Sequence, residues 1–123
     1  MSAKTVLSID DSPSVRQMVR MTLSMAGYQV IEAGDGKEGF EKASTNQINA
    51  VVTDLNMPVM NGLEFIRTFR AHPSSKGVPI ILLTTESDDE LKRQAKEAGA
   101  IAWLVKPFKQ EQLLAVIKKV AGA

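Results

Sequence analysis

The chain contains no cysteine, which excludes a disulfide framework, thiolate chemistry and a cysteine-based zinc site. It also lacks an excess of either charge: the formal net charge is +1, so long-range attraction to nucleic acid or to an anionic membrane is not indicated. No window approaches the roughly 20 apolar residues that a membrane-spanning helix needs, and no apolar stretch precedes Thr5 as in a signal peptide. We therefore expect a cytoplasmic protein that binds neither nucleic acid nor membrane.

The length of the chain limits the number of domains. Its 123 residues suit one compact domain and leave no room for a second of typical size. Hydrophobic residues make up 44% and charged residues 24% of the chain, which is an ordinary globular balance. We expect a single domain over residues 1–123, without an attached output domain.

Short apolar segments alternate with longer amphipathic segments along the whole chain. The apolar segments predict five strands, at residues 5–9, 29–32, 50–53, 79–83 and 101–105. The amphipathic segments predict five helices, at residues 13–26, 36–45, 63–70, 88–98 and 109–120. Strands that alternate with helices imply an α/β fold, in which helices cover both faces of a parallel sheet.

Several predicted helix ends carry capping signals. Ser12 suits an N-cap, and Pro13 suits the first helical position, where its missing N–H costs nothing. Ser87 and Glu90 have the spacing of a capping box, which predicts that Ser87 caps the fourth helix. Gly27 is expected to end the first helix.

Polar residues follow four of the predicted strands. Asp10 and Asp11 follow the first strand, Asp54 the third, Thr84 the fourth and Lys106 the fifth. The carboxyl ends of parallel strands share one edge of the sheet, and ligands bind in the crevice at that edge. The sequence therefore predicts that three carboxylates, a hydroxyl and an amine converge on one site.

Three carboxylates this close together repel one another, so one of them would be driven to take up a proton unless cations intervene. A hard divalent ion with oxygen ligands relieves this repulsion, and carboxylates, a backbone carbonyl and water suit Mg²⁺. We expect Mg²⁺, with Mn²⁺ as an alternative, bound by Asp10, Asp11 and Asp54. Lys106 adds a further positive charge.

Such a site suits phosphoryl transfer, which needs mainly positioning and cancellation of charge on the transferring oxygens. Asp54 is the candidate nucleophile, because a carboxylate can form an aspartyl phosphate. Lys106 would pair with one phosphoryl oxygen. The Thr84 hydroxyl and the backbone N–H of Thr85 would bind another.

At these positions the sequence resembles the receiver domains of bacterial response regulators. The resemblance rests on Asp10–Asp11, on Asp-Leu-Asn-Met-Pro-Val-Met-Asn-Gly at 54–62, on Thr84, and on Lys-Pro-Phe at 106–108. It covers essentially the whole chain and is closest to the stand-alone chemotaxis regulators of the CheY type. It implies a flavodoxin-like (βα)5 doubly wound fold, with a five-stranded parallel sheet in the order 2-1-3-4-5.

The resemblance also implies roles for individual residues. Asp54 matches the phosphorylated aspartate, Asp11 a direct metal ligand, and Asp10 a residue that holds metal-bound water. Asn56 matches the position whose backbone carbonyl binds the metal. Lys106 matches the lysine that pairs with the phosphoryl group.

Further implications concern switching and partners. Thr84 matches the switch hydroxyl, and Trp103 stands where the family usually has Tyr or Phe, the aromatic residue that moves on activation. The Lys106–Pro107 bond is cis in the family. Asp89 and Val116 stand where motor-binding regulators present lysines on the output face, so the sequence departs from the family there.

The resemblance implies that the chain is a monomeric signalling switch rather than an enzyme. A histidine kinase of the CheA type would phosphorylate it, and a flagellar switch protein or a phosphatase would be its further partner. A phosphate sink and a regulator of a non-flagellar chemosensory array are the alternatives within the family. A Mg²⁺-dependent phosphatase-like hydrolase is the alternative from another class, and a flavodoxin-like cofactor carrier disagrees with the acidic crevice.

Overall fold

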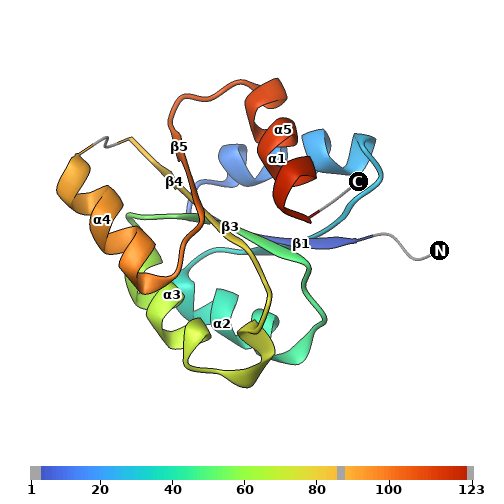
Figure 1. Ribbon diagram of the computed structural model, residues 1–123. Helices are drawn as coiled ribbons and strands as arrows, with labels where there is room; N and C mark the ends of the chain where they lie inside the picture. The colour runs from blue at the N-terminus through green and yellow to red at the C-terminus, as the bar shows by residue number, and fades with distance from the viewer. Residues whose placement is uncertain (1–3, 86–87, 122–123) are drawn as a thin grey trace.

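The computed structural model describes residues 4–85 and 88–121 (Figure 1). Its centre is a five-stranded sheet in the order β2-β1-β3-β4-β5, and every neighbouring pair of strands is parallel. The strands are β1 (Thr5–Ile9), β2 (Gln29–Ala33), β3 (Ala50–Asp54), β4 (Ile80–Thr84) and β5 (Ala102–Val105). The expected α/β class and flavodoxin-like strand order are therefore confirmed.

Helices cover both faces of this sheet (Figure 1). They are α1 (Pro13–Met25), α2 (Gly36–Thr45), α3 (Gly62–Arg70), α4 (Asp89–Ala98) and α5 (Gln110–Ala121), with a short 3-10 helix η1 (Pro73–Ser75). Helices α2, α3 and α4 pack on one face, and α1 and α5 pack on the other. None of the helices in the described ranges is both long and apolar enough to cross a membrane.

The central strands show why the apolar segments of the sequence are nearly continuous. Successive side chains of a strand point to opposite faces of the sheet, so Val51 packs with α2, α3 and α4 while Val52 packs with α1 and α5. All residues of β3 and β4 are buried. A parallel sheet covered on both faces has no solvent-facing positions for polar residues, except where its strands end.

The helix starts confirm one capping prediction and correct another. Ser12 caps α1, and its hydroxyl accepts a hydrogen bond from the Val15 N–H. Ser87 lies outside the described residues, and the N-cap of α4 is Asp88, whose carboxylate accepts from the Glu90 N–H at 2.8 Å. Ser and Asp are equally good N-caps, so composition alone did not distinguish these neighbours.

The boundaries of β4 differ from the sequence prediction by one residue at each end. Pro79 has no N–H to donate, so it lies outside the strand, although its carbonyl accepts from the Val51 N–H at 2.9 Å. At the other end β4 includes Thr84, which pairs with Val105. Thr84, the polar residue that follows the apolar run, is thus part of the sheet, and its backbone is fixed by the pairing of β4 with β5.

Val59, in the loop between β3 and α3, has a left-handed backbone with φ of 69°. The Met60 N–H donates to the Pro58 carbonyl at 2.7 Å, which closes a tight turn around Val59. A β-branched residue is strained in this conformation, and Val59 is exposed and gains little from packing in return.

Replacing Val59 with Asn is expected to raise the free energy of unfolding by about 1 kcal/mol, because Asn tolerates the left-handed region. Urea denaturation would measure the change. Val59→Ala is the matched control: it keeps a Cβ and most of the backbone strain, so its gain should be smaller. An equal gain in both variants would mean that the backbone strain is not the cause.

Candidate functional site

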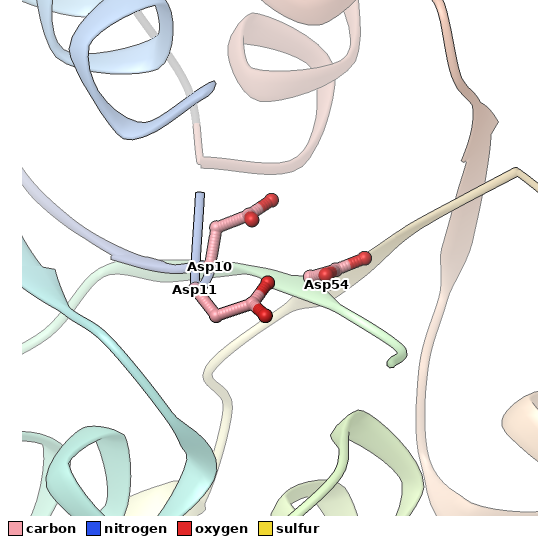
Figure 2. A group of neighbouring side chains, drawn as sticks. All are labelled: Asp10, Asp11 and Asp54. Atoms are coloured by element: carbon pink, nitrogen blue, oxygen red, sulfur yellow. The ribbon is translucent and has the colours of Figure 1, made fainter. Parts of the chain in front are cut away.

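The sheet brings three aspartates together at the carboxyl ends of its central strands (Figure 2). Asp10 and Asp11 directly follow β1, and Asp54 is the last residue of the neighbouring β3. Each offers one carboxylate oxygen, and these three oxygens lie within 4.8 Å of one another. Asp10 and Asp54 are buried, with 1% and 7% of their surface exposed, whereas Asp11 is exposed.

Lys106 joins the two buried carboxylates. Its Nζ donates to Oδ2 of Asp10 at 2.9 Å and to Oδ1 of Asp54 at 3.1 Å. The residue directly follows β5, and its backbone N–H donates to the Thr84 carbonyl at 2.7 Å. Its peptide bond to Pro107 is cis, as the resemblance implied. Residues up to 96 positions apart in the chain therefore meet at this edge of the sheet.

Backbone N–H groups fix the orientation of both buried carboxylates. The Leu55 N–H donates to Oδ1 of Asp54 at 2.9 Å, and the Ser12 N–H donates to Oδ1 of Asp10 at 2.9 Å. A carboxylate that accepts from both a lysine and a backbone N–H has little freedom to rotate. The protein thus presents these two groups in a defined geometry.

The electrostatics of the site favour an additional cation. Burial raises the pKa of Asp54, and the charge of Asp10 raises it further, against the opposing effect of Lys106. For Lys106, burial acts to lower the pKa, but the hydrogen bonds and charges of Asp10 and Asp54 prevail and raise it. Three carboxylates thus face one ammonium group. A divalent ion that prefers oxygen ligands fits this donor set, with Asp10, Asp11 and Asp54 as the residues that could hold it.

The remaining predicted residues lie around this cluster. Thr84 is buried at the end of β4, and Thr85 follows it at the surface. Asn56 lies two residues beyond the end of β3, in the loop to α3. The resemblance also places Glu86 with Asn56 beside the position from which a dephosphorylating water would approach, and Glu86 lies outside the described residues. The roles of Thr84, Thr85 and Asn56 stay predictions.

Trp103 lies on β5, paired with Leu82 of β4 and three residues before Lys106. Its ring is half-buried, and Lys92 of α4 places its Nζ 5.8 Å from the ring centroid. The indole N–H is buried and has no hydrogen-bond partner among the residues that the structure describes. A buried indole N–H normally finds a partner, so this side chain has an unmet interaction on the α4–β5 surface.

The sequence analysis assigned no role in the site to two residues that bear on it. Arg16 contacts the backbone of Asp10 from the first turn of α1, and Gly62 begins α3 directly against the backbone of Asp54. Asn61 and Glu64 form a capping box that fixes the start of α3. The Asn-x-x-Glu spacing could have predicted this start, but the Pro, Asn and Gly content of the preceding loop obscured it.

Gly62→Ala is expected to disturb the site directly. A Cβ at Gly62 would lie 2.3 Å from the Asp54 carbonyl oxygen and 3.0 Å from Cα of Leu55, which are backbone atoms that cannot rotate away. Overpacking of this kind costs about 1–3 kcal/mol of stability. The shift of the Asp54 backbone should also slow any reaction of its carboxylate.

Thermal unfolding and the rate of phosphoryl uptake would measure both effects of Gly62→Ala. Gly34→Ala is the control near the same site, because a Cβ there meets its nearest atoms at the ordinary distances of 3.5 and 3.6 Å. Unchanged stability and reactivity in Gly62→Ala would show that the close approach of Gly62 to the Asp54 backbone is not needed for folding or for the reaction.

Comparisons with known proteins agree with this geometry. Residues 6–118 match the family model described as "Response regulator receiver domain". The chain is similar to the chemotaxis protein CheY1 of Helicobacter pylori, with 39% identity over 95% of this chain and 96% of that protein. It is also similar to the probable chemotaxis protein CheY of Rhizobium etli, with 35% identity over 96% and 92% of the two chains.

Solved structures show the same similarity. The chemotaxis response regulator CheY4 of Vibrio cholerae superposes with a TM-score of 0.92 and 45% identity, covering 97% of this chain and 99% of that one. The receiver domain of a Pseudomonas aeruginosa sensor histidine kinase superposes with a TM-score of 0.90 and 27% identity, covering 99% and 100%. That structure holds a magnesium ion coordinated in its active site cleft.

Proposed function

The chain belongs to the response regulator receiver family, and from this premise we propose that it is a phosphorylation-dependent switch of a chemotaxis system, with Asp54 as the phosphoryl acceptor. One observation carries the proposal: Lys106 bridges the buried carboxylates of Asp10 and Asp54, with Asp11 beside them. A lone surface acid needs no such arrangement. A carboxylate that must accept a highly charged group does need one.

In the proposed reaction, a carboxylate oxygen of Asp54 attacks the phosphorus of a phosphohistidine on the kinase. A P–O bond forms to Asp54 as the P–N bond breaks, and the imidazole ring, which already carries a proton on its other nitrogen, leaves as a neutral group. Hydrogen bonds from Leu55 and Lys106 to Oδ1 of Asp54 hold the carboxylate in place. A bound Mg²⁺ would supply charge neutralisation for the phosphoryl oxygens.

Lys106 is proposed to exchange partners during this step. In the unphosphorylated protein it is shared between Asp10 and Asp54. Once Asp54 carries a phosphoryl group, the new oxygens offer Lys106 a stronger, charge-assisted acceptor. The Thr84 hydroxyl and the Thr85 N–H are proposed to bind a further oxygen, because Thr84 ends the neighbouring strand β4 and Thr85 directly follows it.

The output surface is proposed to lie on α4 and β5. A groove of about 610 Å³ is lined there by Lys92, Lys96, Ile101 and Trp103 among others. Asp89 and Val116 do not supply the lysines expected on this face, but Lys92 and Lys96 bring positive charge to the groove itself. We propose that the partner presents an acidic and partly apolar segment.

The proposed exchange takes place in the cytoplasm between a histidine kinase of the CheA type, this switch, and a flagellar switch protein or a phosphatase. A pull-down that compares the protein loaded with a phosphoryl mimic with the unloaded protein would identify the output partner. A partner that binds both forms equally would contradict a switching role.

The phosphorylation itself can be tested with the purified chain. Incubation with a small phosphodonor and Mg²⁺, followed by intact-mass spectrometry, should show one added phosphoryl group, and EDTA should prevent its uptake. No uptake in the presence of Mg²⁺ would overturn the proposal. Turnover of a panel of phosphate monoesters distinguishes the switch from a phosphatase-like hydrolase, because rapid multiple turnover would favour the hydrolase.

A further inference from the structure

Arg16 contacts the acidic cluster from outside. It lies in the first turns of α1, and its Nη1 donates to the backbone carbonyl of Asp10 at 2.6 Å. Its Nε lies 3.4 Å from Oε1 of Glu32 on β2. The guanidinium therefore connects the end of β1, which carries two of the aspartates, to the neighbouring edge strand.

We propose that Arg16 is a positioning residue for the metal site: it fixes the backbone of Asp10 so that the carboxylates of Asp10 and Asp11 are held ready for a divalent ion. The proposal rests on the proposed function, because it assumes that the cluster binds Mg²⁺. Arg16 itself is not a ligand, since its guanidinium is always cationic and offers no lone pair.

The backbone at Asp10 depends on a side chain for its hydrogen bonding. Strand β1 ends at Ile9, so the sheet ladder does not extend over the carbonyl of Asp10. The Asp10 N–H still donates to the Ala33 carbonyl at 3.0 Å, but its carbonyl is bonded by Arg16. Buried backbone carbonyls need partners, and a guanidinium gives a short, charge-assisted bond.

The hydrogen bonds to Asp10 act together. Its N–H is held by β2, its carbonyl by Arg16, and its carboxylate by the Ser12 N–H and by Lys106. Of these four contacts, only the one to Arg16 comes from a side chain that does not itself face the carboxylates. Removing it should loosen the segment that carries Asp10 and Asp11, while leaving every candidate ligand in the chain.

The guanidinium is also held in place on its other side. Glu32 fixes it by an ion pair, and a Cβ added at Gly34 would lie 3.5 Å from its Nη1, so it rests against the loop between β2 and α2. That loop is tied down in turn, because the Gly34 N–H donates to Oε1 of Glu38 at 2.6 Å. Arg16 thus fills the space between two loops at the carboxyl edge of the sheet.

Arg20 provides a matched control. Its Nη1 pairs with the same Glu32, at 3.2 Å, but within the described ranges of the chain its side chain forms no hydrogen bond or ion pair with the aspartates. Replacing Arg20 therefore removes a positive charge and an ion pair to Glu32 from the same helix. Only Arg16 connects that ion pair to the backbone of Asp10.

The test compares Arg16→Gln, Arg16→Lys and Arg20→Gln with the unmodified protein. Calorimetric titration should show that Arg16→Gln weakens Mg²⁺ binding about 10-fold, the lower end of the effects seen when partners of metal ligands are removed. Arg16→Lys should recover part of the affinity, since a lysine can still donate one bond. Arg20→Gln should bind Mg²⁺ as the unmodified protein does.

A second readout does not involve the metal. In metal-free protein, amide hydrogen exchange at Ser12 should be faster in Arg16→Gln than in Arg20→Gln, because the Ser12 N–H is bonded to the Asp10 carboxylate.

At saturating Mg²⁺ the rate of phosphoryl uptake by Arg16→Gln should return close to that of the unmodified protein.

Equal Mg²⁺ affinity in Arg16→Gln and the unmodified protein would overturn this role of Arg16. So would an equal loss in Arg16→Gln and Arg20→Gln, which would indicate a general electrostatic effect instead. Failure of the unmodified protein to bind Mg²⁺ is a different result: it would overturn the proposed function, and the role of Arg16 with it.

Discussion

Asp54→Asn is expected to reduce phosphoryl uptake to background while the protein stays folded. The amide keeps the shape of the side chain, and its oxygen can still accept from the Leu55 N–H and from Lys106. It is, however, a poor nucleophile, because it carries no negative charge. Intact-mass spectrometry after incubation with phosphodonor and Mg²⁺ would measure the loss.

The stability of Asp54→Asn is a useful second observation. Burial and the charge of Asp10 raise the pKa of Asp54. An acid whose pKa is higher in the folded than in the unfolded protein costs folding free energy once the pH lies above its ordinary value. Neutral Asn removes that cost, so urea denaturation in EDTA should show equal or higher stability at neutral pH.

Asp89→Asn is the control for this experiment, because Asp89 is an exposed residue at the start of α4. It should take up one phosphoryl group as the unmodified protein does. Uptake that persists in Asp54→Asn would place the acceptor elsewhere. Loss of uptake together with loss of folding would conflict with the expected stability.

Lys106→Met is expected to destabilise the metal-free protein by about 3 kcal/mol at neutral pH, since it leaves buried carboxylates without their cation. The affected groups are Asp10 and Asp54, which Lys106 contacts at 2.9 and 3.1 Å. Their charges raise the pKa of Lys106, so its stabilising effect is fully present at neutral pH and is lost only when the pH rises through that raised pKa.

Added Mg²⁺ should recover more stability in Lys106→Met than in the unmodified protein, because the ion replaces the missing positive charge. Urea denaturation with EDTA and with Mg²⁺ would measure this difference. Lys109→Met is the control, because the Lys109 side chain is exposed. If Lys106→Met is as stable as this control in EDTA, the two contacts do not contribute to folding.

Topology explains why the cluster of charged groups could be predicted from the sequence. Asp10, Asp54 and Lys106 each end or follow an apolar run, and a parallel sheet brings the ends of such runs to one edge regardless of the loops between them. The prediction needed only the order and period of the segments. The burial of Asp10 and Asp54 and their shared contact with Lys106 then follow from the central position of β1 and β3.

The supporting residues could not be predicted in this way. Gly62 lies against the Asp54 carbonyl because of the path of the intervening loop. Hydrophobic periodicity predicts helices and strands but not the path of a loop. Arg16 looks like any exposed helix cation in the sequence, since its contact is with a backbone atom. The short helix η1 was missed because three residues are too few to show a helical period.

Strand β5 contains only four residues, from Ala102 to Val105. Lys106 at one end faces the proposed phosphoryl group, and Trp103 within it lines the groove on α4 and β5. A shift of β5 along its axis would therefore move Lys106 in the site and Trp103 in the surface groove at the same time. Transmission of the signal would then need no rearrangement of the core. Insertion of a single residue between Trp103 and Lys106 would turn one of these two side chains to the opposite face of the sheet. We expect such an insertion to abolish partner binding, even in protein whose Asp54 still takes up a phosphoryl group.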